Sequence, residues 1–568
     1  MAFSTGYQVG ADDKKVWKSN INIGPHFMEP YDDDKLFYAS QAAGGEGRWY
    51  LVKDVGSEDG MGTEANNDDW ILSYWAGELS QTANWAPIPN YNSPNVNTYN
   101  KALAHRDTER ILCKWDDENN ILHYVVIYSS TGDKGVRYNR VTMTPGTTGG
   151  HDTWTGRGVN NFKHIIHSNF VNATDNDGTD LDSSLGNYQT SSDHWPNQID
   201  RFSIGLDKRG TNPRIWVSFP YSSDNTNIGI YANCSTNADM TSWVANDGSS
   251  NWPSGTTEAD SVIGDYITLV SDTGHNIKSG TGEDQVIADD CNAKFVDGMT
   301  GGTPFIGLAY TAVATGEKWR YIERSVAANP TAGAGGGFGS AEHIYGSDTA
   351  EPNGHSHHLS IKAYQPAGSN TSNLVFCGKT NDHQIRIAER TSSTWTSVVT
   401  SGATQYGYPN PAIDPDTNNI FIFANPGYAV GLDGQNSGDV LATTYKIDML
   451  ILNKSNLNQY IQDWTTVIED ASNRSVLAPI VGHSDVSTNS NIMVMGVSIL
   501  QASLAGAYSG GFTQGLAGDM RYGYNVIDQT NYTVPVDDEG IQTITLTSPQ
   551  AGDVVTVGES VTITWTTT

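Results

Sequence analysis

Polar clusters lie directly before several strand-like segments of the chain. They occupy residues 105–109, 193–198, 289–290, 355–358 and 406–410. Imidazole and phenol groups can act as base and acid, and a guanidinium can neutralise a carboxylate. Together, such groups could move protons to and from a bound ligand. A ring of them around one mouth of a channel is plausible as a carbohydrate site.

The candidate catalytic residues come from four of these clusters. They are His194, His357, His358, Tyr408 and Arg106, with the histidines and the tyrosine as base and acid and the arginine as neutralising cation. The candidate substrate-binding residues are Trp195, Asn197, Asn410 and Asp289, of which Trp195 offers an aromatic face for a sugar. The alternative for each is a turn or channel-lining residue with ordinary hydrogen bonds.

One acidic loop has the spacing of a cation site. Oxygen ligands at alternating positions around a glycine turn suit calcium, a hard cation. The candidate ligands are Asp175, Asp177, Asp180 and Asp182. The twelfth position is Gly186 rather than the glutamate of an EF-hand, so the predicted calcium has a structural role. The alternative is a solvated acidic loop.

The elements that must position these residues are recognised by an internal repeat. The segment Val-Arg-Tyr-Asn-Arg at 136–140 recurs in variant form at 318–324, 384–390 and 519–525, with weaker copies at 48–54, 227–233 and 441–447. An apolar segment of four to eight residues precedes each copy, which is typical of strands. Most pairs follow a further strand candidate that ends in an aspartate turn, and a Trp-bearing strand follows some of them, as at Trp243, Trp395 and Trp464.

This organisation predicts an all-β chain. We expect an N-terminal arm or edge strand over 1–30 and a seven-bladed β-propeller of three- to four-stranded antiparallel repeats over 31–538. Irregular spacing disfavours a solenoid, and closure into a ring protects the strand edges. Two stacked β-sandwich domains are the alternative. Residues 450–463 fit either a short helix or a strand, and the glycine-rich run at 332–340 fits either a lid over the channel or an ordinary loop.

The arrangement resembles the BNR and sialidase-like propellers, among them the seven-bladed polysaccharide lyases of marine bacteria. The resemblance implies a lyase, in which a base removes the proton next to a uronic carboxylate and an acid protonates the leaving oxygen. Their Asp-box appears in degenerate form at 237–243, and no arginine triad for a sialic acid is identifiable, which disfavours a sialidase. The alternating segment within 539–568 resembles the first strands of a Kre9/Knh-type immunoglobulin-like module. It is shorter than a complete sandwich.

The charge of the chain limits its partners. With 63 acidic and 32 basic residues, the formal net charge is -31, so nucleic acid is disfavoured. No apolar run is long enough to cross a bilayer. The sequence therefore predicts an extracellular or cell-surface propeller that recognises a polysaccharide. The alternative is a non-enzymatic virion or surface protein, such as a phage fibre or decoration protein, that joins a larger assembly through its N-terminal arm or its C-terminal strands.

Overall fold

We analysed a computed structural model of the chain. The structure describes residues 16–18, 27–32, 35–39, 50–54, 70–76, 84–87, 108–116, 118–128, 135–144, 153–156, 163–167, 202–208, 212–221, 229–245, 263–271, 293–312, 318–333, 335–345, 354–380, 384–399, 406–414, 419–426, 446–454, 456–469, 474–482, 491–500, 521–528, 544–548 and 564–567. These residues are almost entirely β-strand, as predicted. None of the helices in this part of the chain could span a membrane.

The described strands form seven antiparallel sheets of four or five strands and one strand pair. The first three sheets contain β2 (Phe27–Asp32), β3 (Lys35–Ala39), β4 (Tyr50–Asp54), β5 (Trp70–Ala76) and β6 (Asn84–Pro87); β7 (Thr108–Asp116), β8 (Ile121–Tyr128), β9 (Gly135–Thr144), β10 (Thr153–Gly156) and β11 (Lys163–His167); and β12 (Ser203–Asp207), β13 (Arg214–Tyr221), β14 (Gly229–Cys234) and β15 (Ile267–Val270). A short 3-10 helix, η5 (Ile263–Asp265), precedes β15.

The next four sheets have the same order. They contain β16 (Ala293–Thr300), β17 (Thr303–Ala312), β18 (Lys318–Arg324) and β19 (Glu342–His343); β20 (Gly354–Tyr364), β21 (Asn373–Thr380), β22 (Ile385–Thr391) and β23 (Thr394–Val399); β24 (Tyr406–Ile413), β25 (Ile420–Pro426), β26 (Lys446–Asn453) and β27 (Asn456–Glu469); and β28 (Arg474–Gly482), β29 (Asn491–Leu500), β30 (Arg521–Asp528) and β1 (Val16–Lys18). Strands β31 (Ile544–Ser548) and β32 (Thr564–Thr567) pair with each other.

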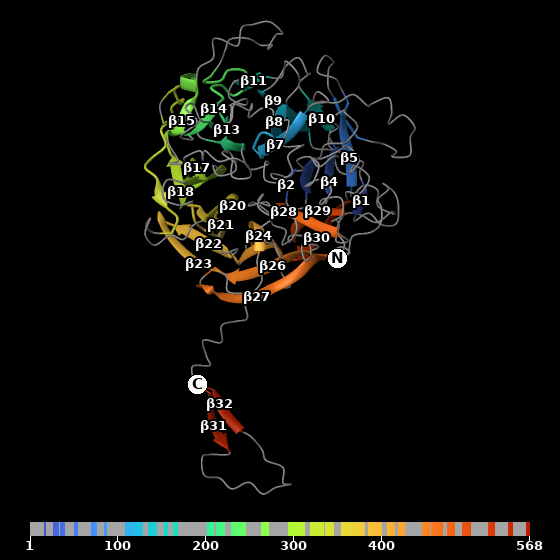
Figure 1. Cartoon of the computed structure of the whole chain (residues 1–568), viewed down its shortest axis with the longest axis vertical. Helices are drawn as coiled ribbons and strands as arrows, with labels where there is room; N and C mark the ends of the chain where they lie inside the picture. Colours follow the sequence, from blue (N-terminus) through green and yellow to red (C-terminus); the bar gives the residue numbers. More distant parts are fainter. Residues whose placement is uncertain are drawn as a thin grey trace, which may run out of the picture.

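The first strands of the seven sheets contact one another in a closed ring. Strand β2 contacts β7, the contacts continue through β12, β16, β20 and β24 to β28, and β28 contacts β2. Figure 1 shows the sheets arranged around this ring. The N-terminal strand β1, within the segment predicted as an arm or edge strand, is the edge strand of the last sheet, paired with β30. This arrangement is consistent with a β-propeller, and it has the sequential order that short connections favour.

Adjacent sheets share their hydrophobic cores. Val375 and Ile387 of one sheet pack in the same cluster as Ile422 and Leu450 of the next. Equivalent clusters join each of the other described neighbours from the β7–β11 sheet to the β28–β30 sheet. A sheet between two such cores is buried on both faces, which explains why β21 and β25 are buried along their whole length and read as continuous apolar runs.

The recurring segment is the third strand of each sheet, as the repeat predicted: β4, β9, β14, β18, β22, β26 or β30. Its arginines tie neighbouring sheets together. Arg140 pairs with Asp239, Arg324 with Asp207, and Arg390 with Glu342. The arginines of the repeat thus have a structural role, because in three places they form ion pairs that connect one sheet to its neighbour.

The structure decides between the two alternatives that the sequence left open for each of two segments. Residues 450–453 belong to strand β26 and residues 456–463 to strand β27 rather than to a helix. The glycine-rich run is not a lid over the entry of the ring, because it follows the end of β18 and packs against the preceding sheet. Phe338 meets Trp216 edge-on at 5.5 Å, and Gly336 and Gly337 have positive φ angles of 60° and 81°, which suit glycine.

Candidate functional site

The entry end of the ring, defined here as the end where the first strands begin, carries the predicted residues that the structure describes. His357 and His358 lie in β20, and Tyr408 and Asn410 lie in β24. Strands β20 and β24 are neighbours in the ring. The structure therefore brings together two of the five sequence clusters.

The remaining predicted residues lie outside the described part of the chain. They are Arg106, His194, Trp195, Asn197 and Asp289 among the catalytic and binding candidates, and Asp175, Asp177, Asp180 and Asp182 among the calcium candidates. Among the described residues, no three His, Cys, Asp or Glu side chains are grouped to hold a metal ion. The predicted calcium loop stays a prediction.

Register shifts interrupt three consecutive first strands near the entry end. The shift lies between Gly354 and Leu359 in β20, between Gly407 and Asn410 in β24, and between Leu477 and Ile480 in β28. Strand β7 has a similar shift between Thr108 and Arg110. Bulges re-aim side chains and are frequent beside active sites and at the rims of barrels. Those in β20 and β24 contain His357, His358 and Tyr408.

Asn410 links two of these bulges and has an unsatisfied acceptor. Its Nδ2 donates to the carbonyl oxygen of Pro479 in β28 at 3.1 Å. A carbonyl only accepts, so this bond fixes which way the amide points. The Oδ1 atom is buried and has no hydrogen-bond partner. Such an acceptor costs about 1–3 kcal/mol until a donor reaches it.

A second polar group at the entry end escaped the sequence analysis. The Tyr406 hydroxyl donates to Asp448 Oδ2 at 3.2 Å, and the Thr466 hydroxyl donates to Asp448 Oδ1 at 2.8 Å. Trp464 stacks on Tyr406 with ring centroids 3.9 Å apart. Burial raises the pKa of Asp448, although the two hydroxyl donors lower it in part. No sequence motif marks this group, because its members come from strands β24, β26 and β27.

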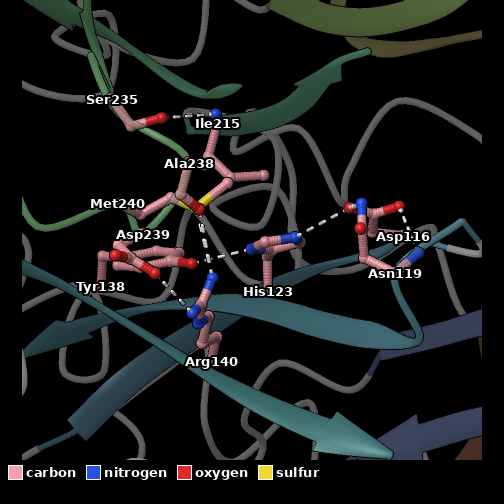
Figure 2. A network of polar contacts seen from close by, with 10 residues as sticks. All are labelled: Asp116, Asn119, His123, Tyr138, Arg140, Ile215, Ser235, Ala238, Asp239 and Met240. Carbon is pink, nitrogen blue, oxygen red and sulfur yellow. Dashed lines mark hydrogen bonds and ion pairs between the residues drawn. The ribbon is translucent and has the colours of Figure 1, made fainter. Parts of the chain in front are cut away.

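A fully buried polar network lies toward the other end of the first strands, and Figure 2 shows its side chains. His123 Nδ1 and the Tyr138 hydroxyl are 2.7 Å apart, and His123 Nε2 is 3.7 Å from Asp116 Oδ2. Asp116 also accepts two hydrogen bonds from Asn119, which close the turn between β7 and β8. Burial alone would raise the pKa of Asp116, but the nearby His123 imidazole and the hydrogen bonds from Asn119 hold it below its usual value. Asp116, His123 and Tyr138 are fully buried, so this network stabilises the sheet and is closed to a large substrate.

The degenerate Asp-box forms a compact turn, but Asp239 does not organise it. Asn237 Oδ1 accepts from the backbone N–H groups of Thr241 and Ser242 at 2.9 and 3.1 Å. Asp239 is largely exposed and pairs instead with Arg140 of the preceding sheet at 3.3 Å (Figure 2). The buried Trp243 closes the turn by donating to the Met240 carbonyl at 3.1 Å.

Known proteins of similar structure are only distantly similar to this chain. No family model and no curated protein matches the chain. The chain is similar in structure to the polysaccharide lyase Uly1, at 9% identity and a TM-score of 0.36, over 93% of this chain and 94% of that one. It is similar to the six-bladed fucose-recognising lectin of Aleuria aurantia, at 9% identity and a TM-score of 0.31, over 73% and 93%. It is also similar to an exo-β-1,3-galactanase of Phanerochaete chrysosporium, at 13% identity and a TM-score of 0.26, over 64% of each chain. Similarity this distant does not indicate an activity. The ring of sheets is established by the strand pairing and the contacts between sheets in this chain.

Proposed function

We propose that the chain is a seven-bladed β-propeller that binds a polysaccharide at the entry end of its ring. The observation that carries this proposal is the pair of neighbouring bulged strands β20 and β24, which hold His357, His358, Tyr408 and the locked acceptor of Asn410. A sugar hydroxyl is a natural donor for that acceptor, because saccharides are rich in hydroxyl groups and protein sites fix them with a few placed polar atoms.

We further propose that the bound polysaccharide is a uronic-acid polymer and that the chain cleaves it as a lyase. Two adjacent strands carry histidine and tyrosine residues, whose imidazole and phenol groups can supply the base and the acid that β-elimination needs. Arg106 is the proposed neutralising cation, and the acidic loop at 175–182 is the proposed site of a structural calcium ion. The enzyme would act in an extracellular setting, where such polymers occur.

The direct test is a panel of uronic-acid polysaccharides, assayed with and without calcium. Cleavage is followed by the ultraviolet absorbance of newly formed unsaturated ends, and binding by affinity electrophoresis. Tyr408→Phe and His358→Ala should abolish cleavage. The matched controls are Tyr460→Phe, on the outermost strand β27, and His343→Ala, on the outermost strand β19, which should cleave normally.

The outcomes separate binding from catalysis. If the protein is retained by a polysaccharide but produces no new absorbance, the proposed binding site is supported and the proposed lyase activity is refuted. Failure to bind or cleave any member of the panel would refute the proposed function. The adhesive or structural alternative would then be tested by asking whether the protein copurifies with a large particle.

A further inference from the structure

The β24–β27 sheet carries a cluster of polar and aromatic side chains at the entry end. Asp448 accepts from two hydroxyl groups there, those of Tyr406 and Thr466. Asp207, by contrast, pairs with Arg324 at 3.2 Å. A carboxylate has about four lone-pair positions, so two hydrogen bonds leave acceptor capacity for further hydroxyl donors.

Trp464 reaches this cluster through an irregularity in its own strand. The register between β26 and β27 shifts between Met449 and Ile451, which leaves Trp464 out of the regular pairing. Its ring stacks on Tyr406 at an interplanar angle of 19°, and its indole N–H has no hydrogen-bond partner. The bulge thus places a partly buried tryptophan against Tyr406, whose hydroxyl bonds to the carboxyl group of Asp448. Bulges re-aim side chains and occur beside functional sites.

The tryptophan of the neighbouring sheet shows what a purely structural counterpart looks like. Trp395 lies in the regular part of β23, opposite Arg390. Its indole N–H donates to Glu342 at 2.9 Å, and its ring meets Tyr321 edge-on at 5.7 Å. Trp395 is thus satisfied by protein partners alone, whereas Trp464 is not.

The charges around Asp448 select against an acidic ligand. Asp463 and Glu469 are exposed on the same strand as Trp464, and Lys446 pairs with Glu469 at 3.8 Å. The local balance of Asp448, Asp463, Glu469 and Lys446 is negative. A carboxylated or sulfated sugar would be repelled, and an uncharged hydroxylated ring would not.

We infer that this cluster is a subsite for one neutral sugar ring, separate from the site in the bulges of β20 and β24. The ring would lie against Trp464, as sugars do on aromatic faces, and its hydroxyls would bond to Asp448 and Thr466. Thr466 is exposed and Trp464 is half-buried, so the cluster reaches the surface. The inference rests on the proposed function only for the class of ligand, a saccharide.

The experiment is saturation-transfer difference NMR with the full chain and four probes. The probes are methyl β-D-galactopyranoside, methyl α-D-glucopyranoside, methyl α-L-rhamnopyranoside and, as the charged comparison, methyl β-D-glucuronide. At least one neutral glycoside should receive saturation. Any saturation of the glucuronide should come from the main site and should be unchanged by Trp464→Ala. Trp464→Ala and Asp448→Ala should weaken binding at least tenfold, and Thr466→Val several-fold. The matched control Trp395→Phe should bind as the parent chain does.

Three results would overturn the inference. They are no transfer to any neutral glycoside, transfer that survives both Trp464→Ala and Asp448→Ala, and transfer to the glucuronide alone. Because Thr466 lies exposed on the outermost strand, Thr466→Val keeps the test valid if the larger truncations unfold the sheet. Tyr408→Phe separates this subsite from the main site, because that variant should lose polysaccharide cleavage and retain binding of the neutral glycoside.

Discussion

Replacing Arg324 by methionine tests whether the recurring arginine holds neighbouring sheets together. Arg324 Nη1 lies 3.2 Å from Asp207 Oδ2, and both side chains are almost fully buried. The same guanidinium donates to the carbonyl oxygens of Gly336 and Ala328 and lies over the Trp216 ring at 5.3 Å. Removing one partner of a buried ion pair costs about 3–5 kcal/mol, because the remaining charge stays buried.

The exposed ion pair of the preceding sheet gives the matched control. Asp239 is 72% exposed where it pairs with Arg140, and exposed pairs contribute at most about 1 kcal/mol. Urea denaturation followed by tryptophan fluorescence should therefore show a loss of about 3–5 kcal/mol for Arg324→Met and less than about 1 kcal/mol for Asp239→Asn. The double variant Asp207→Leu with Arg324→Met should cost less than the sum of its single changes. Equal, small losses for Arg324→Met and Asp239→Asn would refute the reasoning.

Three further outcomes are expected. Burial raises the pKa of Asp448, so its ionised form destabilises the folded chain at neutral pH, and this destabilisation disappears as the pH falls. In urea titrations, Asp448→Asn should therefore raise the free energy of unfolding most near neutral pH, and this gain should shrink under acidic conditions. Gly307→Ala would place a Cβ atom 2.1 Å from the Tyr321 hydroxyl and should lower the free energy of unfolding by about 1–3 kcal/mol in the same assay; a neutral effect would contradict this packing. The thiols of Cys234 and Cys377 are buried, and burial raises the pKa of Cys377, so peptide mapping should find both unlabelled by a thiol reagent until urea unfolds the chain, and rapid labelling in buffer would speak against their burial.

The sequence predicted the repeat because the same demand recurs in each sheet. Where the structure describes its side chains, the third strand of a sheet buries apolar residues between two neighbouring sheets. In three sheets it also reaches a neighbouring sheet with an arginine. That demand leaves a short local pattern, as in 136–140 and 318–324. The aspartates that end the first strands were equally visible, since Asp116 and Asp207 follow an apolar run directly.

The candidate site was predictable only in part. Tyr408 and His358 could be placed near each other because both precede or open a first strand, and such positions meet at one end of a ring. The contact between Asp448 and Tyr406 could not be predicted, because it depends on two side chains crossing the face of a sheet from separate strands. The bulges could not be predicted from the sequence either, because a register shift depends on how two strands pair and has no signature in the sequence of either strand.

The glycine-rich run shows the limit of composition as a guide. Its sequence fits a mobile lid as well as an ordered turn. Its position after the end of β18, and the packing of Phe338 on Trp216, decide between them. Only the topology, which gives each strand its direction in the ring, determines which end of the molecule a loop occupies.

The proposed function requires the polysaccharide to bind at the entry end of the ring, where the first strands begin. Hydrogen–deuterium exchange with and without a polysaccharide retained in affinity electrophoresis tests it most directly. Peptides covering 354–362, 406–413 and 474–482 should exchange more slowly in the complex, whereas those covering 325–345 should not change. Protection confined to 325–345 and the turns at the far ends of the first strands would place the ligand at the wrong end of the ring and contradict the account.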